Sequence, residues 1–242
     1  MYYINSLINS IRITAICVST IVLSLKAQGN ETTKTLLPYE INDPDTLAIW
    51  SMNASEVGEG PDQIKLRGGA KHVEDGGIHG ACLDLTPSIP DIALLPGSAI
   101  PGEDPSFTAE AWVKFITLDE GAQCVFDKSG GGQGFRFDRR RADKKWRMTL
   151  HDSEGNRVNL ISERVDYLEV GKWYHVACSW DSEKDTARIW VDGKLIGEEV
   201  FQDLVYVDAP TGLALGAYQW NKSHGLKGFI DEVRLSSSVR TF

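Results

Sequence analysis

The acidic residues whose spacing comes nearest to a catalytic pair lie in the segment Glu163-Arg-Val-Asp166-Tyr-Leu-Glu169. Hydrolysis of a glycosidic bond normally uses two carboxylates that face each other across the sugar. Successive side chains of a strand point to opposite faces, so the odd separation of Glu163 and Asp166 places them apart. The sequence also lacks a G-x-S-x-G motif, a phosphate-binding loop and a paired-histidine zinc motif. We therefore predict a protein that is not an enzyme, and keep a divergent glycoside hydrolase as a third hypothesis.

A loop that combines aromatic and amide side chains, residues 217–225, is the first candidate for ligand binding. Tyr218 and Trp220 offer rings that can stack on the C–H faces of sugars, and Asn221 offers an amide that can bond to hydroxyl groups. The alternative is that Tyr218 and Trp220 fold back and cover the core. The loop therefore predicts either a sugar-binding surface or a hydrophobic cap.

The second candidate is the run of three arginines Arg139, Arg140 and Arg141, which precedes Trp146 in a predicted hairpin. Adjacent arginines usually form a solvated turn. On an acidic chain they could instead hold a carboxylated or sulfated glycan, because guanidinium groups pair well with such anions. We take Arg140, at the centre of the run, as the candidate contact.

Asp231 is the candidate metal ligand. In a regular strand it shares a face with Phe229 and Val233, so its carboxylate would lie beside core residues and need a partner. One structural calcium ion, which takes six to eight oxygen ligands, is one such partner. A salt bridge with Arg234, or hydrogen bonds to a neighbouring loop, is the alternative.

Short strands separated by Gly, Pro and Asp turns account for most of the chain. The segment Trp173–Trp180 is apolar throughout and predicts a strand buried on both faces, while Phe107–Phe115 alternates between two faces. Asp192-Gly193 predicts a type I′ hairpin turn, which needs positive φ at both positions. No segment after the N-terminal region has a sustained helical period. About a dozen strands of this kind predict an all-β jelly-roll sandwich of two curved antiparallel sheets.

The N-terminal region predicts export. Residues 13–25 form an apolar run after Arg12 that is too short to span a membrane comfortably and is typical of a signal peptide. We predict a signal peptide at 1–29, a flexible leader at 30–44 and one domain at 45–242. After cleavage we expect no membrane insertion.

Composition narrows the range of partners. The formal net charge is −9 and becomes −11 when the basic residues Arg12 and Lys26 leave with the signal. So acidic a protein is not expected to bind nucleic acid. Cys82, Cys124 and Cys178 each lie in a strand-like apolar run and are predicted to be small buried core residues, although two of them could form a disulfide.

Six segments together resemble the laminin G-like domains of the concanavalin A-like lectin/glucanase superfamily. They are GACLDL at 80–85, SFTAEAWVKF at 106–115, GKWYHVACSWD at 171–181, ARIWVDGKLIGE at 187–198, LALG at 213–216 and GFIDEVRLSSSVR at 228–240. The resemblance covers residues 45–240 and implies a non-catalytic module of an exported protein. It also implies that the acid matching Asp231 binds a structural calcium together with oxygens near the N-terminus.

We therefore expect an exported, non-catalytic binding module. Its partner is a polysaccharide or other glycan at the cell surface or in the periplasm. A structural or adhesive module that binds a cell-envelope protein is the alternative.

Overall fold

The computed structural model describes residues 43–86, 91–221 and 223–242. The predicted signal peptide and nearly all of the predicted leader lie outside these residues. No helix among the residues that the structure describes has the length and apolar character needed to cross a membrane.

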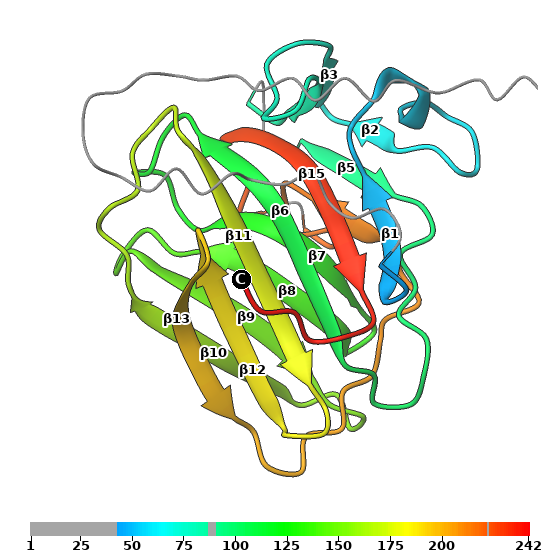
Figure 1. The fold of residues 1–242 in the computed structure, drawn as a ribbon, viewed down its shortest axis with the longest axis vertical. Helices are drawn as coiled ribbons and strands as arrows, with labels where there is room; N and C mark the ends of the chain where they lie inside the picture. The colour runs from blue at the N-terminus through cyan, green and yellow to red at the C-terminus, as the bar shows by residue number, and fades with distance from the viewer. Residues whose placement is uncertain (1–42, 87–90, 222) are drawn as a thin grey trace, which may run out of the picture. The chain divides into compact units, whose positions relative to one another are not determined.

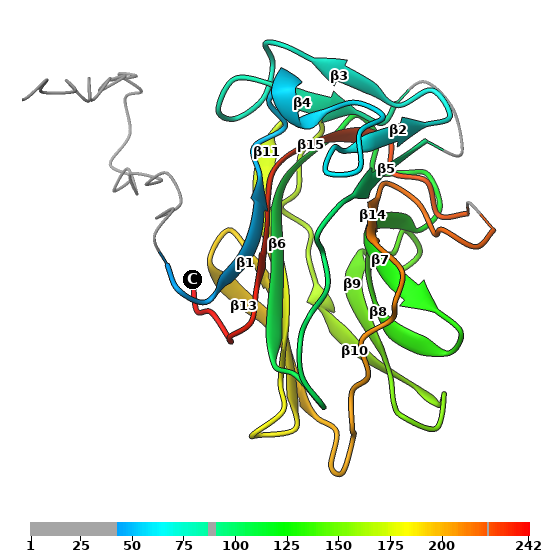
Figure 2. The same cartoon turned by 90° about the vertical axis from the view of Figure 1, so that its right-hand side faces the viewer.

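The described chain forms two antiparallel sheets packed face to face, and the layers separate clearly when seen from the side (Figures 1 and 2). The eight-stranded sheet has the order β13-β12-β11-β6-β15-β4-β3, with β1 paired to β15, and the seven-stranded sheet has the order β10-β9-β8-β7-β14-β5-β2. This architecture confirms the predicted all-β jelly-roll sandwich. The strands are β1 (Thr46–Trp50), β2 (Lys65–Arg67), β3 (Lys71–Val73), β4 (Cys82–Asp84), β5 (Ile92–Leu95), β6 (Phe107–Phe115), β7 (Gln123–Gly130), β8 (Gln133–Arg139), β9 (Lys145–His151), β10 (Arg157–Arg164), β11 (Trp173–Asp181), β12 (Thr186–Val191), β13 (Lys194–Val200), β14 (Leu213–Leu215) and β15 (Gly228–Ser236).

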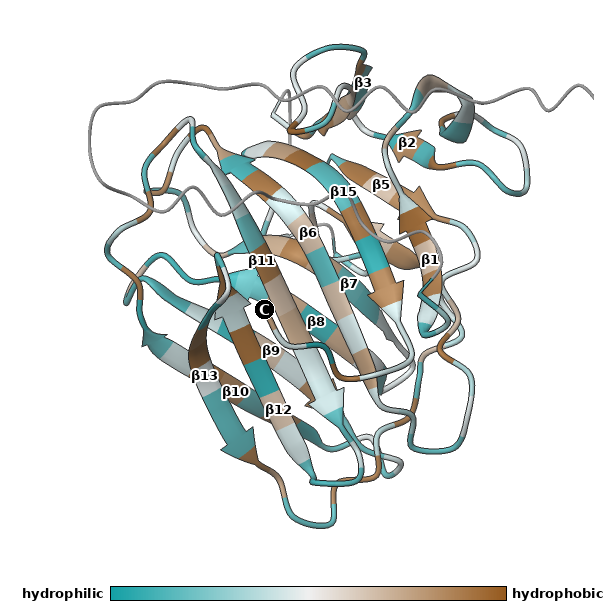
Figure 3. Ribbon diagram, viewed as in Figure 1, coloured by the Kyte–Doolittle hydropathy of each residue, from teal (hydrophilic) through white to brown (hydrophobic). Residues whose placement is uncertain are grey.

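Between the sheets lies one hydrophobic core, and the alternation of side chains along each strand supplies it. Apolar and polar bands alternate along β12 and β15 in Figure 3. In β6 the predicted inward set, from Phe107 to Phe115 at every second position, is fully buried in the core. Phe137 stacks on Trp146 with ring centroids 5.0 Å apart, so Trp146 belongs to the core and not to a surface patch with the arginine run.

The meander β11-β12-β13 confirms the strongest local pattern of the sequence. Asp192 and Gly193 have φ angles of 49° and 75°, as a type I′ turn requires. Every residue of β11 after Trp173 is buried, because the C-terminal segment covers part of its outer face, where the ring of His175 lies 4.9 Å from that of Phe242.

In β15 the simple alternation predicted from the sequence is wrong. The register with β6 shifts between Asp231 and Arg234, and Glu232 has a φ of 47°. This bulge inserts one extra residue, so Asp231 and Arg234 both lie on the outer face while Val233 joins the core. Arg234 pairs with Asp43 at 2.6 Å, so the predicted Asp231–Arg234 salt bridge is replaced by other contacts of both residues.

The three cysteines of the described chain are free and buried. Burial raises the pKa of the Cys82 thiol to about 11 and raises that of Cys178 further. Their role as small core residues is therefore confirmed, and none forms a disulfide with another.

Candidate binding site

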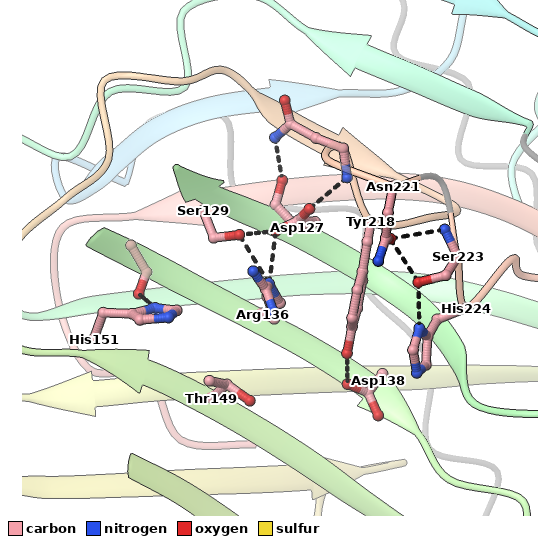
Figure 4. A network of polar contacts seen from close by, with 12 residues as sticks. Asp127, Ser129, Arg136, Asp138, Thr149, His151, Tyr218, Asn221, Ser223 and His224 are labelled. Carbon is pink, nitrogen blue, oxygen red and sulfur yellow. Dashed lines mark hydrogen bonds and ion pairs between the residues drawn. The ribbon is translucent and has the colours of Figure 1, made fainter. Parts of the chain in front are cut away.

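Polar side chains gather on the outer face of the seven-stranded sheet. In β8 and β9 the residues Phe135, Phe137, Trp146 and Met148 fill the core. The residues that alternate with them, Arg136, Asp138, Arg147 and Thr149, therefore point to the opposite face. Figure 4 shows Arg136, Asp138 and Thr149 there. This outer polar face lies beneath the loop 217–225 that the sequence predicted to bind a ligand.

Tyr218 fastens that loop to the sheet. Its hydroxyl donates a hydrogen bond to Asp138 Oδ2 at 2.7 Å and accepts one from Arg147 Nη2 at 2.8 Å. The guanidinium of Arg136 lies 4.7 Å from the centre of the ring, and the ring of His224 stacks on it at 4.3 Å. Burial, and then the charge of Asp138, raise the pKa of Tyr218 above its usual range. Tyr218 is only 7% exposed, so in this structure it positions the loop.

Gln219 forms the second attachment of the loop. Its backbone N–H donates to Asp127 Oδ2 at 2.6 Å, and its side-chain amide donates to the carbonyl oxygens of Asp127 and Gly212 at 2.7 and 2.8 Å. Ser129 donates to the other carboxylate oxygen of Asp127 at 2.5 Å. The backbone immediately before Trp220 is therefore fixed by several hydrogen bonds.

Trp220 itself projects into solvent and is 70% exposed. It borders a pocket of about 410 Å³, here named the Trp220 pocket. The remaining lining residues come from the β7–β8 hairpin, the segment before β14 and the loop itself, and they are Ser129, Gly130, Gly131, Gln133, Pro210, Thr211 and Gln219. The pocket therefore combines one exposed indole with polar side chains and glycine backbone.

Asn221 and Arg140, the other two predicted contacts, lie elsewhere. Asn221 Oδ1 accepts hydrogen bonds from the backbone and hydroxyl of Ser223, which shapes the loop (Figure 4). Arg140 forms an ion pair with Asp143 at 3.1 Å. It borders a separate pocket of about 490 Å³ together with Arg141, Arg147 and His224. Trp220 and Arg140 thus line two different pockets.

Asp231 is fully buried and accepts hydrogen bonds from backbone N–H groups. Oδ2 accepts from Ile78 at 2.8 Å and His79 at 3.2 Å, and Oδ1 accepts from Glu232 at 2.7 Å. N–H groups cannot ligate a cation, so these surroundings fit a hydrogen-bond acceptor better than a calcium ligand. No three His, Cys, Asp or Glu side chains among the described residues are grouped as a metal site. Calcium binding stays a prediction.

Glu232, in the β15 bulge, is expected to make the free energy of unfolding depend on pH. Burial, followed by the charges of Asp231 and Glu56, raises the pKa of Glu232 to about 7. The folded protein therefore binds a proton on the Glu232 carboxyl more tightly than the unfolded chain does. The contribution of this proton to the free energy of unfolding is fully present below pH ~4.5 and is lost as the pH rises to ~7. We expect Glu232→Gln to reduce the gain in unfolding free energy between pH 8 and pH 5 by about 2 kcal/mol.

Urea unfolding of the wild type and Glu232→Gln at both pH values measures this difference. Other titrating groups are common to the two proteins and cancel to first order. An equal pH dependence in both proteins would show that Glu232 titrates normally.

The acids that resemble a catalytic set are held in surface ion pairs. Glu163 pairs with Lys194, Asp166 with Lys144 and Arg164, and Glu169 with Lys172. All three carboxylates are more than half exposed. They therefore lie on the surface in separate pairs, without facing each other across a common pocket.

Asp127, Asp138 and Gln219 were missed by the sequence analysis. Asp127 and Asp138 are fully buried although they lie on the outer face, because the loop covers them. The alternation of polar and aromatic residues in Gly134–Arg139 was a usable signal for that face. Nothing local in the sequence indicates that a loop 80 residues later would supply the partner of Asp138.

The two sheets define a jelly-roll sandwich with a polar outer face, and sequence comparison identifies its family. Residues 90–241 match the laminin G family described as the concanavalin A-like lectin/glucanases superfamily. The chain belongs to this superfamily.

Solved structures show the same fold at low identity. The binding domain of the Paraclostridial mosquitocidal protein 1 is 14% identical, with a TM-score of 0.58 over 74% of this chain and 45% of that one. The binding domain of botulinum neurotoxin serotype G is 12% identical, with a TM-score of 0.61 over 81% of this chain and 48% of that one. This chain thus matches less than half the length of these domains. No curated protein matches the sequence.

Proposed function

We propose that this chain is an exported, non-catalytic carbohydrate-binding module that binds a glycan in the Trp220 pocket, at the cell surface or in the periplasm. The main observation that supports this proposal is the exposed indole of Trp220. Trp220 is 70% exposed, whereas Trp50, Trp112, Trp146, Trp180 and Trp190 are each 8% exposed or less. A large aromatic side chain presented to solvent on an anchored backbone is typical of a ligand contact.

The chemistry of the pocket suits a sugar. The indole offers a flat apolar surface for the C–H face of a pyranose ring. Gln133 and the backbone of Gly130 and Gly131 also line the pocket and can form hydrogen bonds with hydroxyl groups. A Cβ added at Gly131 would meet no atom within 4 Å, so the hairpin leaves open space beside the pocket. Membership of a superfamily named for lectins supports the same function.

Asp127, which is hydrogen-bonded to two residues of the Trp220 pocket, supports binding without turnover. Asp127 is fully buried, and its two carboxylate oxygens accept hydrogen bonds from Ser129 and Gln219. A general acid or base must reach the bond that is cleaved. In this position Asp127 acts on the shape of the loop, because it fixes the backbone that presents Trp220.

We expect Trp220→Ala to weaken glycan binding about 30-fold, which corresponds to roughly 2 kcal/mol for the loss of a central aromatic contact. The fold should be unaffected, since Trp220 lies outside the core. Native gel electrophoresis in the presence of soluble polysaccharides measures the effect as the loss of retardation. Tyr167→Ala removes another exposed aromatic, 44% exposed, and is the matched control.

Retardation of the wild type and the control, but not of Trp220→Ala, supports the proposal. Equal retardation of all three proteins contradicts it. The alternative, a module that binds an envelope protein, has its own candidate surface, because Leu195 and Val200 on the edge strand β13 are 44% and 57% exposed. Capture of one defined protein from an envelope extract, lost on Val200→Asp and kept on Trp220→Ala, would favour that alternative.

A further inference from the structure

A pocket of about 440 Å³ opens at one end of the sandwich, away from Trp220. Three segments form its walls: the chain after β6, the turn between β8 and β9, and the connection between β10 and β11. Its lining residues are Ile116, Thr117, Leu118, Asp119, Arg139, Arg141, Lys144, Val165, Asp166, Leu168 and Val170. We name it the Arg139 pocket.

Positive charge predominates in this pocket. Arg139, Arg141 and Lys144 line it, against Asp119 and Asp166. Asp166 is already shared between Lys144 at 2.9 Å and Arg164 at 2.7 Å, and these bonds lower the pKa of its carboxyl to about 2. Asp166 is therefore engaged at the surface with Lys144 and Arg164, which leaves Asp119 as the other acid that lines the pocket.

Arg139 is the least exposed cation of the pocket. It is 2% exposed and belongs to the inward-facing set of β8, with its guanidinium 5.9 Å from the ring of Phe115. Its Nη1 donates to the carbonyl oxygen of Leu118 at 3.0 Å. Its Nε is buried and lacks a hydrogen-bond partner among the residues that the structure describes.

Burial lowers the pKa of Arg139, because a charged guanidinium is less stable away from water, and the nearby charge of Asp119 offsets part of this effect. Asp119 also lines the pocket, although no ion pair joins it to Arg139 in the described part of the chain. Arg139 and Arg141 both line the pocket, so an oxyanion that enters it would lie near both guanidinium groups. Arginine binds such groups through directed N–H bonds, which gives geometric selectivity as well as affinity.

We propose that the Arg139 pocket is a second binding site, which takes the carboxylate or sulfate group of a small acidic ligand, with Arg139 as the buried contact and Arg141 at the entrance. The apolar side chains of Leu118, Leu168 and Val170 would contact the body of that ligand. This site is separate from the Trp220 pocket, so it stands whether or not glycans bind there.

The side-chain N–H signal of Arg139 Nε reports on this site directly. In ¹H–¹⁵N spectra of the full chain, we expect that signal to shift saturably when sodium sulfate or glucuronate is added. The two probes distinguish a sulfate from a carboxylate ligand, and glucose serves as the neutral control.

Two single substitutions test the assignment without removing a buried residue. Arg141→Ala should weaken binding of the effective probe about tenfold, since it removes one charged contact. Arg157→Ala removes an exposed arginine outside the pocket and should leave the affinity unchanged, as should Trp220→Ala. The proposal fails if the Arg139 signal shows no saturable shift with either anion, if glucose shifts it equally, or if Arg157→Ala weakens binding as much as Arg141→Ala.

Discussion

Replacement of Asp231 by alanine is expected to lower the free energy of unfolding by about 3 kcal/mol or more. The substitution removes the acceptor of three backbone N–H groups, those of Ile78, His79 and Glu232. The bonds from Ile78 and His79 join the last strand to a loop more than 150 residues earlier in the chain, and buried donors left without an acceptor each cost free energy. Urea unfolding at pH 8 measures the change, and Asp62→Ala, at an exposed position, should alter stability by less than about 0.5 kcal/mol.

Unfolding with and without calcium tests whether Asp231 also binds a metal ion. If the Asp231 carboxylate only accepts hydrogen bonds, the urea midpoint of the wild type should be the same with calcium and with a chelator. A higher midpoint in calcium that disappears in Asp231→Ala would assign the carboxylate to a metal site. Equal stability of Asp231→Ala and Asp62→Ala would contradict both accounts.

Replacement of Lys128 by methionine is expected to cost about 3 kcal/mol and also to weaken glycan binding. The Lys128 ammonium group is 1% exposed and donates to the carbonyl oxygens of Ala209 and Thr211 at 2.8 and 2.9 Å. It also pairs with Asp208 at 2.9 Å. Methionine keeps the length of the side chain but leaves the half-buried carboxylate of Asp208 and two carbonyls without this donor.

Lys128 is expected to affect glycan binding because it holds residues 209–211 in place. Pro210 and Thr211 form one wall of the Trp220 pocket, so loosening them should reduce affinity even in molecules that remain folded. Calorimetric titration of folded protein separates this effect from the loss of stability. Lys71→Met, at an exposed position, is the control and should change neither quantity. A Lys128→Met variant with full stability would show that the ammonium group is not needed to hold residues 209–211.

Regular strands were predictable from the sequence because their patterns are local. The alternation in Phe107–Phe115 placed every second residue in the core, and Asp192-Gly193 specified its own turn. The bulge at Glu232 was not predictable, because a positive φ at a glutamate follows from tertiary contacts and carries no local signal. That one extra residue moved Val233 to the core and Arg234 to the outer face.

The candidate site was predictable only in outline. The sequence singled out loop 217–225 as aromatic and polar, but the different positions of Tyr218 and Trp220 depend on distant residues. Asp138 and Arg147 hold the Tyr218 hydroxyl, while Trp220 has no comparable partner among the residues that the structure describes and projects outward. The residues of the arginine run also differ in position, because Arg139 ends β8 with its side chain inward, whereas Arg141 lies in the turn after the strand and is exposed.

A glycan array probed with the wild type, Tyr167→Ala and Trp220→Ala side by side is the most direct test of the central claim. The account predicts that the wild type and Tyr167→Ala retain the same defined set of glycans and that Trp220→Ala loses that set. No bound glycan, or an unchanged set with Trp220→Ala, would contradict a carbohydrate site at the Trp220 pocket.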